Sequence, residues 1–110
     1  MIIEKKGTTT IVTQEKATIV ELVAALTKKY DTLKNDNIIV NLFSLKKITS
    51  IDIAEFLLLS RKHKKAKYSF VIVNGSIAYN EAADEITITP TLQEAHDLIQ
   101  MEEIERDLEL

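Results

Sequence analysis

The fold is decided by a short, apolar and β-branched run at residues 38–43, Ile38-Ile39-Val40-Asn41-Leu42-Phe43. It follows the turn-forming cluster at 35–37, which consists of two asparagines around an aspartate. A run of this kind is typical of a strand buried on both faces, as the central strands of a parallel sheet are. The sequence therefore predicts a central strand over 38–43.

A helix is predicted directly after this strand. The hydroxyl groups of Thr49 and Ser50 can satisfy the free N–H groups at a helix start. The residues that follow predict a helix over 51–65, and Asp52 suits the positive end of its dipole.

A second apolar run, at 68–73, predicts the next strand. Asn74-Gly75 ends it, because this dipeptide favours a turn. A link of small residues is expected over 75–84.

The N-terminal part of the chain predicts a hairpin and a helix. Residues 2–13 are rich in β-branched side chains and are interrupted at Gly7, as two short strands would be. An amphipathic helix is expected from Lys16 to about Asn35, because apolar residues recur there with a 3.6-residue period. They are Ile19, Leu22, Val23, Leu26, Tyr30 and Leu33.

The C-terminal part predicts an outer strand and a last helix. Residues 85–89 alternate between polar and apolar, and Pro90 ends the strand because it has no N–H to donate. Thr91 and Glu94 have the spacing of a capping box. The helix behind it carries Leu92, Ala95, Leu98, Ile99, Ile104 and Leu108.

The predicted order is ββ-α-β-α-β-β-α, which favours a mainly parallel sheet covered by helices. We expect one α/β domain over 1–110, with an acidic helical extension at 102–110. The chain has 110 residues, of which 45% are hydrophobic, enough for one core.

Composition excludes several classes of function. The net charge of −3 disfavours a whole-domain affinity for nucleic acid or anionic membrane. The absence of cysteine excludes disulfides, thiolate metal sites and cysteine nucleophiles, and it fits a cytoplasmic protein. We expect no secretory signal and no membrane span, because no apolar run approaches the ~20 residues that a spanning helix needs.

Residues 8–99 resemble the STAS family, the sulfate-transporter and anti-sigma-factor-antagonist domains. Val40-Asn41-Leu42 matches the family's Val-Asp-Leu-like strand end. The stretch Phe70-Val71-Ile72-Val73-Asn74 matches its Leu-Val-Leu-Val-Asn-like strand, and Thr91-Leu92-Gln93-Glu94-Ala95 its last strand-to-helix segment. The resemblance implies a STAS-like fold and a regulatory, protein-binding role.

Switch members of that family are phosphorylated on a hydroxyl of an Asp-Ser-Ser/Thr-Gly loop, beside a helix N-terminus. The loop falls here on Thr49-Ser50-Ile51-Asp52. Thr49 replaces the acidic residue, and Ile51 replaces the phospho-acceptor and has no hydroxyl. The resemblance thus implies a degenerate phosphorylation loop in which Ser50 is the remaining candidate for modification.

The C-terminal part, 91–108, is similar to small bacterial proteins labelled ribonuclease Z. That nuclease needs a His-x-His-x-Asp-His metal motif in a much longer chain, whereas this chain has only His63 and His96. The label is therefore interpreted as borrowed from a neighbouring gene, and a partnership with the nuclease remains an alternative.

The residues predict no catalytic centre, metal site or cofactor. Two histidines on different helices are too few for a triad or a metal site. Gly7 and Gly75 are the only glycines, so neither a P-loop nor a Gly-x-Gly-x-x-Gly turn can be built.

A basic run offers a second type of surface. Nucleic-acid phosphates could be contacted by Arg61, Lys62, Lys64, Lys65 and Lys67. The stronger interpretation is structural, since cations at a helix C-terminus complement its negative end and no aromatic array for base stacking accompanies them.

Two segments keep alternatives open. The extension at 102–110 is either an acidic docking helix or a fraying helix end. The loop at 49–52 is either a partner surface or a simple cap. The leading hypothesis is a non-enzymatic STAS-like module that binds a protein through Thr49, Ser50, Ile51, Asp52 and Glu55. The alternative is an RNA-processing accessory protein that binds RNA or ribonuclease Z through the basic segment 61–67.

Overall fold

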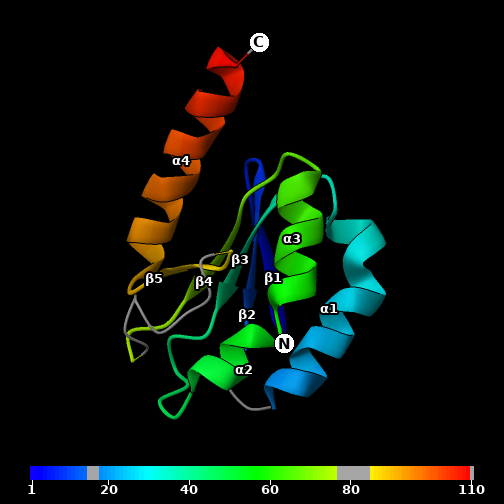
Figure 1. Ribbon diagram of the computed structural model, residues 1–110, viewed down its shortest axis with the longest axis vertical. Helices are drawn as coiled ribbons and strands as arrows, with labels where there is room; N and C mark the ends of the chain where they lie inside the picture. Colours follow the sequence, from blue (N-terminus) through cyan, green and yellow to red (C-terminus); the bar gives the residue numbers. More distant parts are fainter. Residues whose placement is uncertain (15–17, 77–84, 110) are drawn as a thin grey trace.

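The computed structural model describes residues 1–14, 18–76 and 85–109, which form a five-stranded sheet with helices on both faces (Figure 1). The strands lie in the order β1-β2-β3-β4-β5. The strand β1 (Ile2–Lys6) is antiparallel to β2 (Thr9–Thr13), and the pairs from β2 to β5 are parallel. The mainly parallel α/β sheet predicted from the sequence is therefore confirmed.

The strand β3 (Asn37–Asn41) is the middle strand of the sheet, as predicted. Ile38, Ile39 and Val40 are all buried, so both faces of the strand are covered. Phe43 departs from the prediction: it lies beyond the strand, with 63% of its surface exposed. The strand β4 (Phe70–Val73) is buried throughout, and β5 (Thr87–Thr89) forms the far edge.

Three helices share one face of the sheet, as the strand order requires. The helix α1 (Ile19–Leu33) connects β2 to β3, and it begins at the cap Thr18. The predicted start at Lys16 lies outside the described residues, as does most of the predicted link at 75–84. The helices between β3 and β4 cover the same face, because right-handed crossovers that add strands in one direction stay on one side.

The prediction of a single helix over 51–65 is wrong, because the structure has two helices there. The helix α2 (Ser50–Ala54) ends before Phe56, and α3 (Leu57–Lys65) begins after it. The N–H of Phe56 donates to the carbonyl oxygen of Ile53, which tightens the backbone to a three-residue turn. Ile53, Phe56 and Leu59 are thereby all buried at three-residue spacing, and this burial explains the break.

The last helix, α4 (Leu92–Leu108), covers the opposite face of the sheet. Its cap is the predicted one, since Thr91 Oγ1 accepts from the N–H of Glu94 at 3.2 Å. Ala95 and Ile99 are buried against Ile39 and Val71, whereas the second half of the helix projects beyond the sheet (Figure 1). No helix in the described part of the chain combines the length and the apolar character needed to cross a membrane.

Candidate functional site

The candidate site lies where the parallel strands end. The strands β2, β3 and β4 end at Thr13, Asn41 and Val73, and the chain leaves β3 here to reach α2. In open α/β sheets this carboxyl edge is the usual place for ligands and partners. The loop predicted to bind a partner lies at this carboxyl edge.

Thr49 and Asp52 cap α2 by bonding to each other. Thr49 Oγ1 accepts from the N–H of Asp52 at 3.2 Å, and Asp52 Oδ2 accepts from the N–H of Thr49 at 3.0 Å. The Thr49 hydroxyl also donates to Asp52 Oδ2 at 3.2 Å. This reciprocal capping box occupies both side chains, so they shape the loop.

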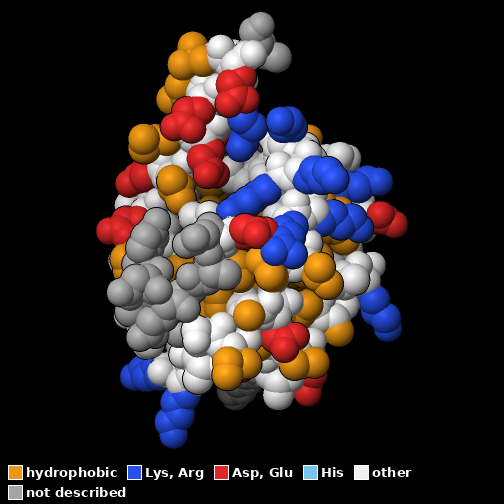
Figure 2. Space-filling model, viewed as in Figure 1, with side chains coloured by type: hydrophobic (Ala, Val, Ile, Leu, Met, Phe, Trp, Pro, Cys, Tyr) orange, Lys and Arg blue, Asp and Glu red, His pale blue; other side chains and the backbone are white. Residues whose placement is uncertain are grey.

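The residues next to the cap face solvent. Ser50 is the first residue of α2 and is exposed, and Glu55 follows the end of α2 and is exposed too. Ile51 has 77% of its surface exposed, and Leu58, seven positions later on α3, has 78%. We call Ser50, Ile51, Glu55 and Leu58 the α2 surface; Figure 2 shows hydrophobic side chains gathered over this part of the molecule.

A hollow of about 430 Å³ lies beside the cap. Asp52 and Ile48 contribute to it from the α2 side, and Thr18 and Ile19 from the start of α1. The exposed Lys46 and Lys47 are part of its wall. The structure thus brings the starts of two helices together at one edge, a juxtaposition that the sequence did not predict.

Asn74 anchors the loop that leads to α2. Its Nδ2 atom donates to the carbonyl oxygens of Leu42 at 3.0 Å and Leu45 at 2.8 Å. The sequence marked Asn74 as a turn residue and as the end of the family-like strand, but not as an anchor of the loop. The anchoring role could have been predicted from the position of Asn74 directly after a buried strand. Parallel strands end at the same edge of the sheet, so a side chain there lies next to the loop that follows the neighbouring strand.

The basic segment begins one helical turn after Leu58 and continues to the C-terminal end of α3. Arg61 pairs with Glu85 through Nε–Oε2 and through Nη2–Oε1, the second at 2.9 Å. The hydrogen bond from Arg61 is the main cause that lowers the pKa of Glu85. Lys64 Nζ donates to Thr87 Oγ1 at 2.8 Å, and burial lowers the pKa of Lys64. Lys62 Nζ lies 4.6 Å from the centroid of the Tyr30 ring. Three of the five predicted phosphate-contacting cations are therefore engaged within the chain.

Lys67, another of these cations, ends the helix through its backbone. Its φ of 72° lies in the left-handed region, which is uncommon for a residue other than glycine. Its side chain is exposed, as are those of Lys62 and Lys65.

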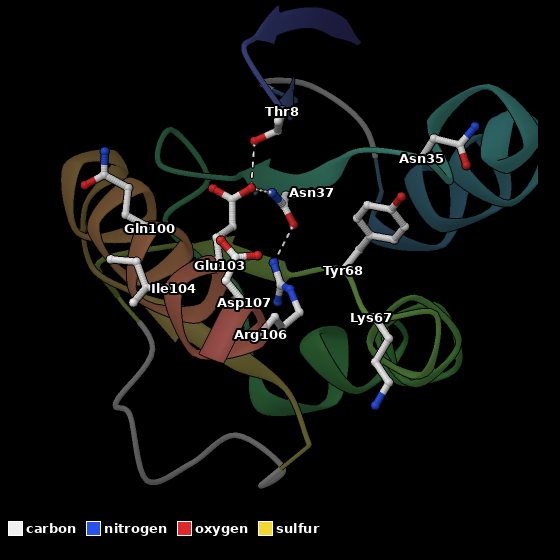
Figure 3. A pocket seen from close by; sticks show the side chains of 10 residues that line it. All are labelled: Thr8, Asn35, Asn37, Lys67, Tyr68, Gln100, Glu103, Ile104, Arg106 and Asp107. Atoms are coloured by element: carbon white, nitrogen blue, oxygen red, sulfur yellow. Dashed lines mark hydrogen bonds between the residues drawn. The ribbon is translucent and has the colours of Figure 1, made fainter. Parts of the chain in front are cut away.

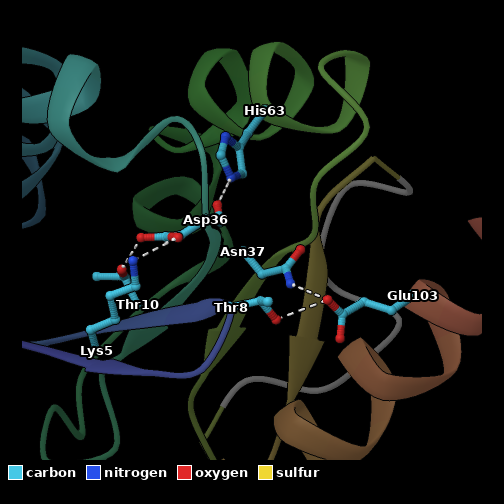
Figure 4. Close-up of polar contacts among 7 residues, drawn as sticks. All are labelled: Lys5, Thr8, Thr10, Asp36, Asn37, His63 and Glu103. Carbon is cyan, nitrogen blue, oxygen red and sulfur yellow. Dashed lines mark hydrogen bonds and ion pairs between the residues drawn. The ribbon is translucent and has the colours of Figure 1, made fainter.

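His63 is packed inside the protein. It is fully buried, and its Nε2 atom lies 2.7 Å from the carbonyl oxygen of Asp36 (Figure 4). Its ring also stacks on Tyr68. In the part of the chain that the structure describes, no group of three or more histidine, aspartate or glutamate side chains could hold a metal ion.

A second cleft, of about 620 Å³, lies at the opposite edge of the sheet, where the strands begin (Figure 3). Its polar groups bind one another: Thr8 Oγ1 and Asn37 Nδ2 donate to Glu103 Oε2 at 2.9 Å and 3.2 Å (Figure 4). Arg106 Nη2 donates to Asn37 Oδ1 at 3.2 Å. The sequence did not predict this network, which joins α4 to the sheet edge.

The fold and the capped loop define the class: this is an α/β domain with a STAS-like fold. A serine-to-glutamate variant of RsbS from Moorella thermoacetica superposes with a TM-score of 0.65. The two sequences are 14% identical, and the match covers 90% of this chain and 93% of that one. No protein-family model and no curated protein sequence matches the chain. The likeness therefore establishes the fold, and the ribonuclease Z resemblance is not shown.

Proposed function

We propose that this chain is a non-enzymatic, STAS-like regulatory module that binds a protein partner through the α2 surface and the cap Thr49–Asp52. The observation that carries the proposal is the exposure of Ile51 and Leu58, at 77% and 78%, beside a rigidly capped helix start. Large apolar side chains exposed on neighbouring elements are a feature of protein-binding surfaces. The RsbS-like fold supports the regulatory part of the proposal.

Polar side chains lie on the same two helices as the exposed apolar pair. Ser50 and Glu55 are exposed on the same two-helix unit as the apolar pair, so a partner meets an apolar centre with polar neighbours. Interfaces are commonly built in this way, with polar groups at the rim. Thr49 and Asp52 take part by holding α2 in place, because they are bound to each other.

Photo-crosslinking tests the proposal by capturing whichever protein binds this surface. A photoreactive amino acid replaces the exposed Ala54 on α2, and in a matched control it replaces the exposed Ala24 on α1. We expect a discrete protein adduct from position 54 in cells that express the chain, and none of the same mass from position 24. Mass spectrometry of the adduct identifies the partner and shows whether it is ribonuclease Z.

The same experiment with Ile51→Asp and Leu58→Asp together decides whether the apolar pair carries the binding. Both side chains are exposed, so the double variant should fold with a change in stability within about 1 kcal/mol. We expect the adduct to disappear. An adduct that survives this change, or that forms equally at position 24, would overturn the proposal.

Ser50 is the proposed site of modification in the degenerate loop. Its hydroxyl is exposed at the start of α2, where helix N–H groups favour a phosphate. Incubation with kinase-containing extract and ATP should place phosphate on Ser50, and Ser50→Ala should remove it. Phosphate found only on Thr49, or no phosphate in the segment, would exclude this part of the proposal.

A further inference from the structure

The second half of α4 carries an exposed apolar stripe. Met101 borders a hollow beside β5, and Ile104 borders the cleft at the start of the strands. Met101, Ile104 and Leu108 are spaced three and four positions apart, so they share one side of the helix. Their exposed fractions are 59%, 60% and 80%. Ala95 and Ile99, which pack on the sheet, lie on the other side. The helix thus has a second apolar face that the fold leaves uncovered.

Contacts at the sheet edge hold this stripe outward. Arg106 Nη1 donates to Ser69 Oγ at 3.1 Å, and Arg106 Nη2 and Glu103 both bind the Asn37 amide (Figure 3). Asn37 and Ser69 are each only 1% exposed. The stripe cannot turn toward the core unless these part-buried hydrogen bonds break, so its apolar groups are available to another molecule.

The charge next to the stripe restricts what can cover it. From 101 to 109 the helix has one basic residue, Arg106, among five acidic ones. They are Glu102, Glu103, Glu105, Asp107 and Glu109, of which Glu103 is bound to Thr8 and Asn37 at the sheet edge. Two such stripes packed together would bring like charges into contact, which is unfavourable. A surface that combines apolar groups with positive charge is the better complement.

The chain itself carries such a surface. A hollow of about 650 Å³ on α3 is lined by Arg61, Lys62, Lys64, Lys65 and Glu85. The stems of lysine and arginine are aliphatic and their ends are charged, so the walls are apolar beneath a basic rim. Figure 2 shows these cations gathered over α3, near the base of the projecting helix.

We propose that two copies of the chain associate by docking the apolar stripe of α4 from one copy into the basic hollow on α3 of the other. Within one chain α3 and α4 pack on opposite faces of the sheet, so we assign the contact to two copies. The contact is head-to-tail, since two different surfaces meet. It goes beyond the proposed function, which uses the α2 surface.

Two variants, each with one surface destroyed, test the contact. Ile104→Asp with Leu108→Asp disrupts the stripe (the stripe variant). Lys62→Glu with Lys65→Glu reverses two charges of the hollow (the hollow variant). All four side chains are exposed. Sedimentation velocity over a concentration series should show self-association of the unchanged chain. Each variant alone should associate at least about tenfold more weakly.

An equimolar mixture of the two variants is the decisive sample. One variant retains the hollow and the other retains the stripe, so the mixture should form a 1:1 dimer that cannot extend. Raising the salt concentration should weaken it, because the charges of the contact are solvent-accessible. As a matched control, Lys28→Glu with Lys29→Glu changes the same number of exposed charges on α1 and should retain self-association.

Three results would overturn the proposal. The unchanged chain could remain monomeric at the highest concentration, or one of the two variants could associate as well as the unchanged chain. A mixture that stays monomeric although the unchanged chain associates would show that the stripe does not meet the hollow. If the stripe variant loses self-association and the hollow variant keeps it, the contact is instead a pairing of two α4 helices.

Discussion

The hydroxyl oxygen of Tyr30 lies 2.8 Å from Nδ1 of His63, a buried contact that joins α1 to α3. Nε2 of the same ring lies 2.7 Å from the carbonyl oxygen of Asp36. Because a carbonyl oxygen only accepts, we assign the proton of the neutral ring to Nε2, so that Nδ1 accepts from Tyr30. One imidazole thus connects two helices to the turn before β3.

Acidification should destabilise the protein through His63. Burial is the largest influence and lowers the pKa of His63 below 6.5, although the hydrogen bond to Asp36 acts in the opposite direction. Below pH 6.5 the unfolded chain binds a proton that the folded chain does not, so the free energy of unfolding falls as the pH falls. Urea titrations from about pH 7.5 to about pH 5.5 measure this slope.

His63→Gln should reduce that slope, since it removes the buried titrating group, and it should also lower stability at neutral pH. His96→Gln removes the other histidine, and this variant should have the same slope as the unchanged chain. A slope that disappears with His96→Gln and persists with His63→Gln would contradict this assignment.

Tyr30→Phe should lower the free energy of unfolding by about 1–3 kcal/mol, because Nδ1 of His63 is left buried without a donor. Tyr68→Phe makes the same chemical change in a half-buried tyrosine that stacks on His63, and it should cost less. Urea unfolding at neutral pH compares the two variants. Equal losses would show that the Tyr30 hydroxyl has no special role.

Asn74→Ala should destabilise the loop before α2, because the carbonyl oxygens of Leu42 and Leu45 lose their side-chain donor. The expected cost is about 1–3 kcal/mol. Asn74→Asp should cost more, since it places a carboxylate against the same oxygens. Asn35→Asp, at an exposed position, should stay within about 0.5 kcal/mol of the unchanged chain. Losses of similar size at both positions would refute the anchoring role.

Gly7→Ala should lower the melting temperature through backbone strain. Gly7 has φ of 60° in the turn between β1 and β2, and an added Cβ would meet nothing within 4 Å. The cost is therefore conformational, about 1–2 kcal/mol. Gly7→Asn should cost less, because asparagine tolerates the left-handed region. Calorimetry separates the two, and an alanine variant as stable as the unchanged chain would contradict the prediction.

Local pattern was sufficient for most of the fold. The buried run at 38–43 predicted the central strand, the 3.6-residue stripe predicted α1, and Thr91 with Glu94 predicted the start of α4. These signals are periodicity and capping, which depend on residues a few positions apart. The capped loop of the candidate site was predicted for the same reason, since Thr49 and Asp52 are neighbours in the chain.

The sequence by itself determined the order of the strands, which strands are joined through helical segments, and the position of the capped loop. Only the tertiary structure decided that α2 and α3 are separate, that Asn74 holds the loop, and that Arg106 reaches Asn37 across 69 positions of chain. It also decided that Ile51 and Leu108 face solvent whereas Ile53 and Ile99 are buried. The physical reason is that such burial depends on which distant surface each side chain meets, and residue type and spacing do not specify that surface.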